Sequence, residues 1–298
     1  MTGRPRIRAV ASASAAYGLP WRADLEELLY LRDLYAPFGV PLHEDRLRSG
    51  GTTTHRELVR SALDGASAAA EAARNADLVV IAGILPDLHP FDPVGAYVQR
   101  RLESPGLGFT VSGQGTAAPF TALRTAAAFQ RAGRARTSIV VIVEQATHPD
   151  PAGAPVADRA AAGDGCVLLV LDGEEDGAER PGAAGGMRIE DVCRVRADSR
   201  AAGTRLLEAE VDRHTRGAAP GEVLVVLGPH VPPDLRVPDT AAVIRVDRPG
   251  YGTGVWLEFA AHHTAWAAAH RRIVLCEADA RRPGHGDLLL LSGGPARA

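Results

Sequence analysis

The 298-residue sequence predicts an α/β protein built from two similar halves. Strand-like apolar runs alternate with helix-like segments over most of the chain, a pattern typical of largely parallel sheets covered by helices. A Gly/Thr turn, an Ala-rich helix and a strand occur in that order in each half, at 113–143 and at 250–276. This repetition indicates an internal duplication, with the halves related by a pseudo-two-fold axis.

In the first half, the spacing of Leu25, Leu28, Leu29 and Leu31 predicts an amphipathic helix over 24–35. Thr52, Thr53 and Thr54 are N-cap candidates for a second helix over 55–74. Predicted strands are 6–11, 78–82, 107–112, 138–143 and 166–171.

In the second half, an Asp or Ser cap precedes a predicted helix over 198–216, and a long helix is predicted over 255–270. Predicted strands are 187–195, 222–227, 241–246, 272–276 and 287–291. The segment between the halves is acidic and Gly-rich, which predicts a linker loop. We therefore expect an N-terminal half at 1–172, a linker at 173–186 and a C-terminal half at 187–298.

Composition narrows the function classes. The net charge of −3 and the pI near 6.4 argue against nucleic acid or an anionic membrane as a partner. The N-terminus lacks the apolar segment of a signal peptide, and no apolar run reaches the length of a membrane span. We therefore expect a cytoplasmic protein.

The cysteines and histidines predict no metal site and no cofactor. Cys166, Cys193 and Cys276 lie in apolar strand-like runs without CxxC spacing, which favours reduced, buried thiols over a disulfide or zinc framework. The histidines of the predicted 255–270 helix do not match the usual ligand patterns of zinc.

The turn at 113–116 is the first candidate site. A strand that ends in a tight turn before a helix is where many enzymes place a nucleophile, because backbone N–H groups and the helix dipole there stabilise negative charge. The turn has the sequence Gly-Gln-Gly-Thr, without cysteine or carboxylate. The architecture of a nucleophile site is thus predicted without a nucleophile.

Six segments, in order, resemble the thiolase superfamily and within it the β-ketoacyl synthase III branch. They are ADLVVIAGILPD, the nucleophile segment GLGFTVSGQGTAAPF with its following helix and strand, AAGDGCVLLVLD, VLVVLGPHVPPDL, PGYGTGVWLEFAA and GDLLLLSGG. The resemblance implies a thiolase-like fold, in which two pseudo-duplicated βαβ halves pack as a five-layer αβαβα sandwich.

The departures from the family pattern concern its catalytic residues. The nucleophilic Cys position falls on Gly115 or Thr116, depending on how the turn is aligned, and Thr253 stands at the lost Asn position. The family His is matched by His230, which is then a remnant, a core histidine or a substrate-orienting group. The resemblance also implies that a loop containing Leu88, His89 and Phe91 reaches into the acyl pocket of a partner subunit; the alternative is a rigid Pro-rich surface loop.

The first hypothesis is a non-catalytic ketosynthase-III-like subunit of a heterodimer with an active, Cys-containing homologue. The complex would condense acyl thioesters, carried by CoA or an acyl-carrier protein, in bacterial secondary or fatty-acid-derived metabolism. One alternative is a stand-alone acyltransferase or thioester hydrolase that uses His230 without an acyl-Cys intermediate. Another is a homodimer that only sequesters an acyl thioester.

Overall fold

The computed structural model describes the chain at residues 5–15, 25–39, 42, 44, 53–85, 87, 93–145, 164–173, 186–248, 251–279 and 281–293. Leu88, His89 and Phe91 of the predicted partner-pocket loop lie outside the described residues, as does the linker apart from Gly173 and Gly186. No helix among the described ranges is long and apolar enough to cross a bilayer.

The fold is organised around a ten-stranded sheet with the strand order β3-β2-β4-β5-β1-β6-β10-β9-β7-β8. The strands are β1 Arg6–Ala15, β2 Leu78–Gly83, β3 Leu107–Val111, β4 Thr137–Glu144, β5 Asp164–Asp172, β6 Met187–Val195, β7 Val223–Leu227, β8 Ala242–Arg245, β9 Arg272–Ala278 and β10 Gly286–Ser292. Every residue of β2 and β7 is buried, which explains their continuous apolar sequences.

The strand order confirms the internal duplication. Each half places its third strand at the outer edge and its first strand at the centre, so the second half repeats the order of the first. The halves join where β1 pairs with β6, through Arg6 with Arg188 and Ile7 with Met187.

The prediction of largely parallel sheets is wrong, because the sheet is mixed. β2 pairs in parallel with β3 and β4, and β7 with β8 and β9. β5 runs antiparallel to β4 and β1, and β10 runs antiparallel to β9 and β6. The sequence predicts no crossover helix between β4 and β5 or between β9 and β10, and a strand that follows its neighbour without a crossover returns antiparallel.

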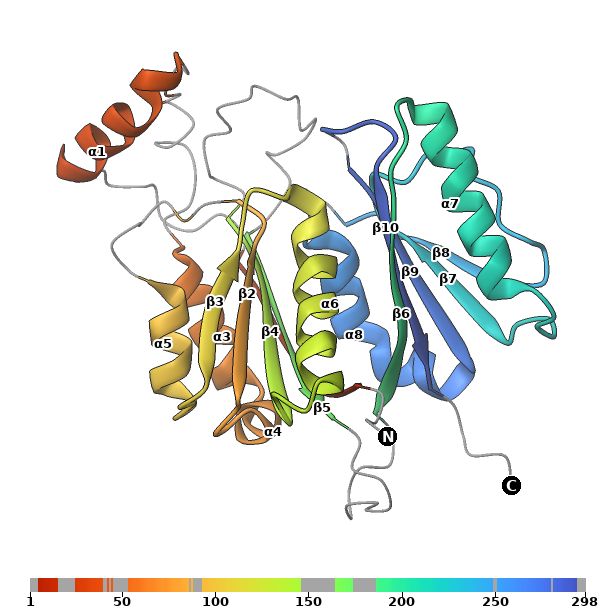
Figure 1. Ribbon diagram of the computed structural model, residues 1–298, viewed down its shortest axis with the longest axis horizontal. Coiled ribbons are helices and arrows are strands. Elements are labelled where there is room, and N and C mark those ends of the chain that lie inside the picture. Colours follow the sequence, from red (N-terminus) through yellow and green to blue (C-terminus); the bar gives the residue numbers. More distant parts are fainter. Residues whose placement is uncertain are drawn as a thin grey trace.

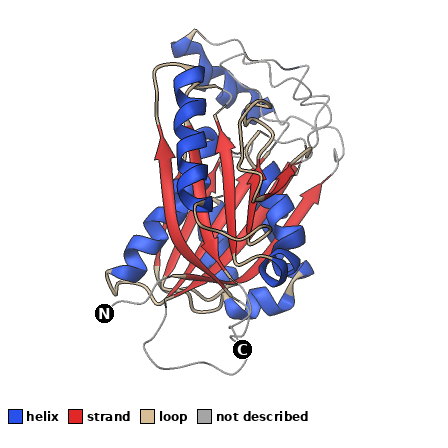
Figure 2. Ribbon diagram, turned by 90° about the vertical axis from the view of Figure 1, so that its right-hand side faces the viewer, coloured by secondary structure: helices blue, strands red, loops and turns tan. Residues whose placement is uncertain are grey.

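The described helical segments complete five layers (Figure 1). In Figure 1, α3, α4 and α5 cover the outer face of the first half, α6 and α8 lie between the halves, and α7 covers the second half; Figure 2 views the molecule from the side of α7. The segments are α1 Leu25–Tyr35, η1 Ala36–Phe38, α3 His55–Gly65, α4 Ser67–Ala72, α5 Val94–Arg101, η2 Gly115–Ala117, α6 Ala118–Arg131, α7 Arg200–Thr215 and α8 Gly254–Ala269.

The structure divides one predicted helix into two, α3 and α4. The segment 55–74 begins as predicted, with a capping box between Thr54 and Glu57, but it breaks at Ala66, where φ is −138° and ψ is 69°. A glycine inside a helix is less favourable than alanine by about 1 kcal/mol, so ending the helix at Gly65 loses the least helix stability. The apolar stripe continues across the break, which is why the sequence pattern does not reveal it.

The central helices meet in the layer between the halves. The rings of Phe120 on α6 and Trp256 on α8 lie edge to face with centroids 5.1 Å apart. The Ala-rich sequences of both helices predict burial on nearly all faces. Most small residues of α6 are buried, although Ala128 is exposed, whereas in the second half of α8 Ala261 and Ala265 are exposed. The N-terminal end of α8 is therefore its buried end, and the candidate site lies there and at the start of α6.

Candidate functional site

The turn between β3 and α6 has left-handed backbone at two glycines. Gly113 has φ of 70° and Gly115 has φ of 54°, in the left-handed region that favours glycine. Gly115 opens the 3₁₀ turn η2, which runs directly into α6, and Thr116 is buried with 2% exposure. The structure therefore has the tight strand–turn–helix connection that the sequence predicts.

Contacts from the second half hold this turn in place. Arg194 on β6 donates hydrogen bonds to the Ala117 carbonyl at 3.2 Å and to the Thr121 hydroxyl at 2.8 Å. Its Nε also pairs with Asp287 at 2.8 Å. Burial raises the pKa of Asp287 to about 6, although Arg194 opposes this rise. Hydrogen bonds from Arg194 thus join the start of α6 to β6, and the ion pair joins β6 to β10.

Tyr251 occupies the space where a side chain at position 115 would extend. A Cβ atom built on Gly115 would lie 2.5 Å from the Tyr251 hydroxyl oxygen, closer than non-bonded atoms approach. Tyr251 is only 2% exposed. Burial, with the charge of Asp279, raises the pKa of Tyr251, so its hydroxyl stays protonated. A cysteine at position 115 therefore does not fit beside Tyr251.

The side chain of Tyr251 is held on two sides. Its hydroxyl donates to Asp279 Oδ1 at 3.2 Å, and the Arg281 guanidinium carbon lies 4.5 Å above the ring centre. A cation over the face of an aromatic ring is stabilising, and more so away from water. Tyr251 is therefore a fixed part of the site.

Thr116 is the second residue that the resemblance is expected to place at the nucleophile position. Among the described residues, no imidazole or carboxylate hydrogen-bonds to its hydroxyl. A threonine hydroxyl without an adjacent base is a weak nucleophile. The three cysteines lie in β5, β6 and β9, and burial raises the pKa of Cys166 to about 12, so that thiol stays protonated.

His230 follows β7 and faces Tyr251. Its Nε2 lies 2.9 Å from the Tyr251 carbonyl oxygen, so this nitrogen is the donor, and the two rings are 5.7 Å apart. Burial lowers the pKa of His230, which the hydrogen bond to Tyr251 and the charges of Glu144 and Asp279 partly offset. The imidazole is therefore neutral near pH 7, with Nε2 already engaged.

Thr253, which the resemblance is expected to place at the family Asn position, donates to Glu144 at the end of β4. Glu144 accepts hydrogen bonds from the backbone N–H groups of Tyr251, Gly252 and Thr253 and from the Thr253 hydroxyl, all at 2.9 Å. The carboxylate is 2% exposed and stands at the N-terminus of α8, where the helix dipole favours negative charge. The Thr253 hydroxyl therefore donates its proton to this carboxylate and has none left to donate to an oxyanion.

A second carboxylate, Glu277, stands at the end of β9. Its Oε1 accepts hydrogen bonds from the backbone N–H groups of Ala278 at 2.9 Å and His230 at 3.3 Å. Its Oε2 has no hydrogen-bond partner among the described residues. Burial raises the pKa of Glu277 to about 8. Only glycine fits at position 228 beside Glu277, because a Cβ atom there would lie 2.1 Å from Glu277 Oε2.

A cavity of about 320 Å³ opens beside His230. Its lining includes polar groups from Arg200, Asp279 and His285. The apolar part of the lining includes Val231 and Pro232. The cavity is large enough for a small ligand or for one end of a longer one.

The structure thus brings Gly115, His230 and Thr253 together around Tyr251. Thr116 lies beside Gly115 on the same turn. Sequence reasoning missed Glu144, Glu277 and Asp279 as site residues. Each follows an apolar strand directly, in TSIVVIVE and RIVLCEAD, and a carboxylate at the end of a buried strand is the signal that could have identified them.

Comparisons with known proteins assign the fold. No family model and no curated protein sequence matches the chain. Solved structures match along almost its whole length at low identity. AbyA1, a tetronic acid condensing enzyme, has a TM-score of 0.65 at 16% identity and covers 97% of this chain and 100% of its own. A variant of OleA from Xanthomonas campestris has a TM-score of 0.59 at 16% identity, covering 98% and 100%.

The 3-oxoacyl-(acyl carrier protein) synthase III, FabH, from Pseudomonas aeruginosa PAO1 has a TM-score of 0.56 at 16% identity, covering 99% and 100%. These similarities show that the chain has the thiolase-like fold of synthase-III-type condensing enzymes, as the resemblance implies. At this identity they show the fold alone.

Proposed function

We propose that this chain is a subunit without its own nucleophile in a condensing-enzyme complex that acts on acyl thioesters. The observation that carries the proposal is the position of Tyr251, whose hydroxyl takes the space of a side chain at Gly115. Thr116 lacks a base, and Thr253 is bound to Glu144. An acyl-enzyme intermediate therefore has to form on another chain.

The partner is a homologue that retains the nucleophilic cysteine. Strand β3 is at the outer edge of the sheet, with Leu107 54% exposed, so its free backbone groups are available to a strand of a second subunit. β8 is the opposite edge strand, with Val243 46% exposed, and serves as a matched comparison.

Co-expression with a Cys-containing homologue from the same organism tests the proposal. We expect a stable one-to-one complex that condenses acyl thioesters, with activity absent from either chain alone. Leu107→Lys is expected to break the complex and Val243→Lys to leave it intact. Condensation by this chain alone, or acylation of Thr116 seen by intact-mass analysis after incubation with acyl-CoA, contradicts the proposal.

A second candidate is direct acyl transfer or thioester hydrolysis that uses His230. The cavity of about 320 Å³ beside this residue favours it. Release of free thiol from acyl-CoA by the purified chain, abolished in His230→Ala, would support this function. No release above the rate of His230→Ala excludes it.

A further inference from the structure

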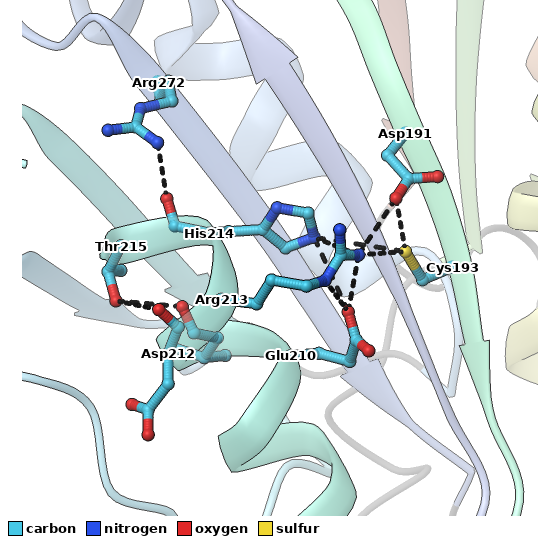
Figure 3. Close-up of polar contacts among 9 residues, drawn as sticks. Asp191, Cys193, Glu210, Asp212, Arg213, His214, Thr215 and Arg272 are labelled. Carbon is cyan, nitrogen blue, oxygen red and sulfur yellow. Dashed lines mark hydrogen bonds and ion pairs between the residues drawn. The ribbon is translucent and has the colours of Figure 1, made fainter. Parts of the chain in front are cut away.

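A cluster of polar side chains lies between β6 and α7, on the outer face of the second half (Figure 3). Asp191 and Cys193 are alternate residues of β6 and therefore lie on one face of the strand. Glu210, Arg213 and His214 are three and four residues apart on α7 and share a helix face. This cluster is separate from the residues around Tyr251, and the function proposed above does not use it.

The cluster is organised around one nitrogen atom. Arg213 Nη2 lies 3.1 Å from Asp191 Oδ2, 3.3 Å from Cys193 Sγ, 3.1 Å from His214 Nε2 and 2.6 Å from Glu210 Oε2. A carboxylate pair, a thiol and an imidazole nitrogen thus converge on a single cationic position. Because Arg213 has no lone pair to offer, His214 Nε2 faces it as an acceptor, the form in which imidazole binds a metal.

The spacing of these atoms approaches that of a metal coordination shell. The ligand atoms of Asp191, Cys193 and His214 all lie within 4.8 Å of one another. Sγ is 2.9 Å from Asp191 Oδ2 and 4.0 Å from His214 Nε2, which in turn is 3.8 Å from Glu210 Oε2. A tetrahedral zinc ion holds its ligand atoms about 3.3–3.6 Å apart, as follows from Zn–S of about 2.3 Å and Zn–N or Zn–O of about 2.0–2.1 Å.

We propose that Asp191, Cys193, Glu210 and His214 bind a divalent transition-metal ion, with Zn²⁺ the best match, at the position that Arg213 Nη2 holds in its absence. The mixed sulfur, nitrogen and oxygen donors suit Zn²⁺ and exclude Mg²⁺ and Ca²⁺, which prefer oxygen alone. The backbone carbonyl of His214 accepts a hydrogen bond from Arg272 at 2.8 Å, which fixes this end of α7.

The exchange balances in charge. The metal binds as its dipositive ion, the Cys193 thiol releases its proton to solvent, and the guanidinium leaves the centre. A charge of +2 therefore replaces the +1 of the guanidinium and the +1 of the thiol proton. The Arg213 side chain is already 49% exposed, so it can turn into solvent without crossing packed protein.

Titration with Zn²⁺ against a chromophoric chelator, and with Co²⁺ as a spectroscopic probe, tests the site. We expect one metal ion per chain and a near-ultraviolet thiolate-to-cobalt charge-transfer band. Arg213→Ala removes the competing cation and is expected to tighten Zn²⁺ binding about tenfold or more. Cys193→Ser, which is nearly isosteric, removes the thiolate ligand and is expected to lose the band and more affinity than the about tenfold to hundredfold that loss of an outer-shell partner costs.

The matched control is Asp212→Asn, because Asp212 is on the same helix turn but its carboxylate points away from the cluster in Figure 3. This variant should bind the metal as the wild type does. Zn²⁺ should also raise the melting temperature of the wild type but not of Cys193→Ser. If neither the wild type nor Arg213→Ala binds Zn²⁺ or Co²⁺ better than Cys193→Ser, Arg213 is only a structural ion-pair partner and the proposal is wrong.

Discussion

The buried carboxylate of Glu144 gives the sharpest test of how the site is held together. Glu144→Gln keeps the shape of the side chain but replaces one acceptor oxygen by an NH₂ donor. Glu144 Oε2 accepts three hydrogen bonds and Oε1 accepts one, from the Tyr251 N–H. Glutamine therefore places its oxygen toward the three donors and turns its NH₂ group toward the Tyr251 N–H.

The magnitude follows from these contacts. A hydrogen bond to a charged group contributes about 1.5–3 kcal/mol and a neutral one about 1 kcal/mol. One charged bond is lost and three become neutral, so we expect Glu144→Gln to lower the free energy of unfolding by at least about 3 kcal/mol. Thr253→Val removes only the hydroxyl bond to the carboxylate and should lower the free energy of unfolding by about 1.5–3 kcal/mol.

Urea unfolding at neutral pH, followed by the fluorescence of the tryptophans on α8, measures both losses. The double variant should lose less than the sum of the single losses, because the two residues share a bond. Hydrogen exchange should rise at the amides of 251–253 in Glu144→Gln and stay low elsewhere. A loss below about 1 kcal/mol with unchanged exchange at these amides would refute the role given to Glu144.

Three further predictions concern Gly115, Glu277 and His55. Gly115→Ala should destabilise by about 1–3 kcal/mol, through its positive φ and its contact with the Tyr251 hydroxyl, and by less in a Tyr251→Phe background; equal losses in both backgrounds would rule out that contact. Because burial raises the pKa of Glu277 to about 8, the folded state holds its proton more tightly than the unfolded state. Stability should therefore fall as pH rises from about 5 to about 8, and Glu277→Gln should flatten the slope, whereas an unchanged slope in unfolding experiments would assign it to other groups. Burial lowers the pKa of His55 to about 4, so stability should rise as pH increases from about 4 to 6.5, and His55→Asn should remove this part of the acid dependence if the assignment is correct.

The fold could be predicted largely because its signals are local. The strands and helices appear as apolar runs, caps and turns, and the repetition of 113–143 at 250–276 corresponds to α6 with β4 and α8 with β9. Strand direction was harder, since it depends on pairing partners far along the chain. The break at Ala66 is hidden because the apolar stripe of α3 continues into α4.

The site could be predicted only in part. The positions of Gly115, His230 and Thr253 follow from the order of the motifs, whereas the hydrogen bonds of Glu144 to Tyr251 and Thr253 join residues more than a hundred positions apart in the sequence. The cluster at Arg213 was missed for a related reason. Its possible ligands are alternate residues of a strand and residues of a helix face, so no linear spacing reveals them.

The exclusion of a side chain at position 115 is built into the packing around Tyr251. Three hydrogen bonds fix Tyr251. Its backbone N–H donates to Glu144, its carbonyl oxygen accepts from His230, and its hydroxyl donates to Asp279. His230 thus holds the residue whose hydroxyl takes the space of a side chain at position 115. A cysteine at position 115 would meet Tyr251, and moving Tyr251 would break the contact that positions His230. Introducing a cysteine at position 115 therefore requires changes at both positions, and Gly115→Cys alone is expected to destabilise the fold without becoming acylated.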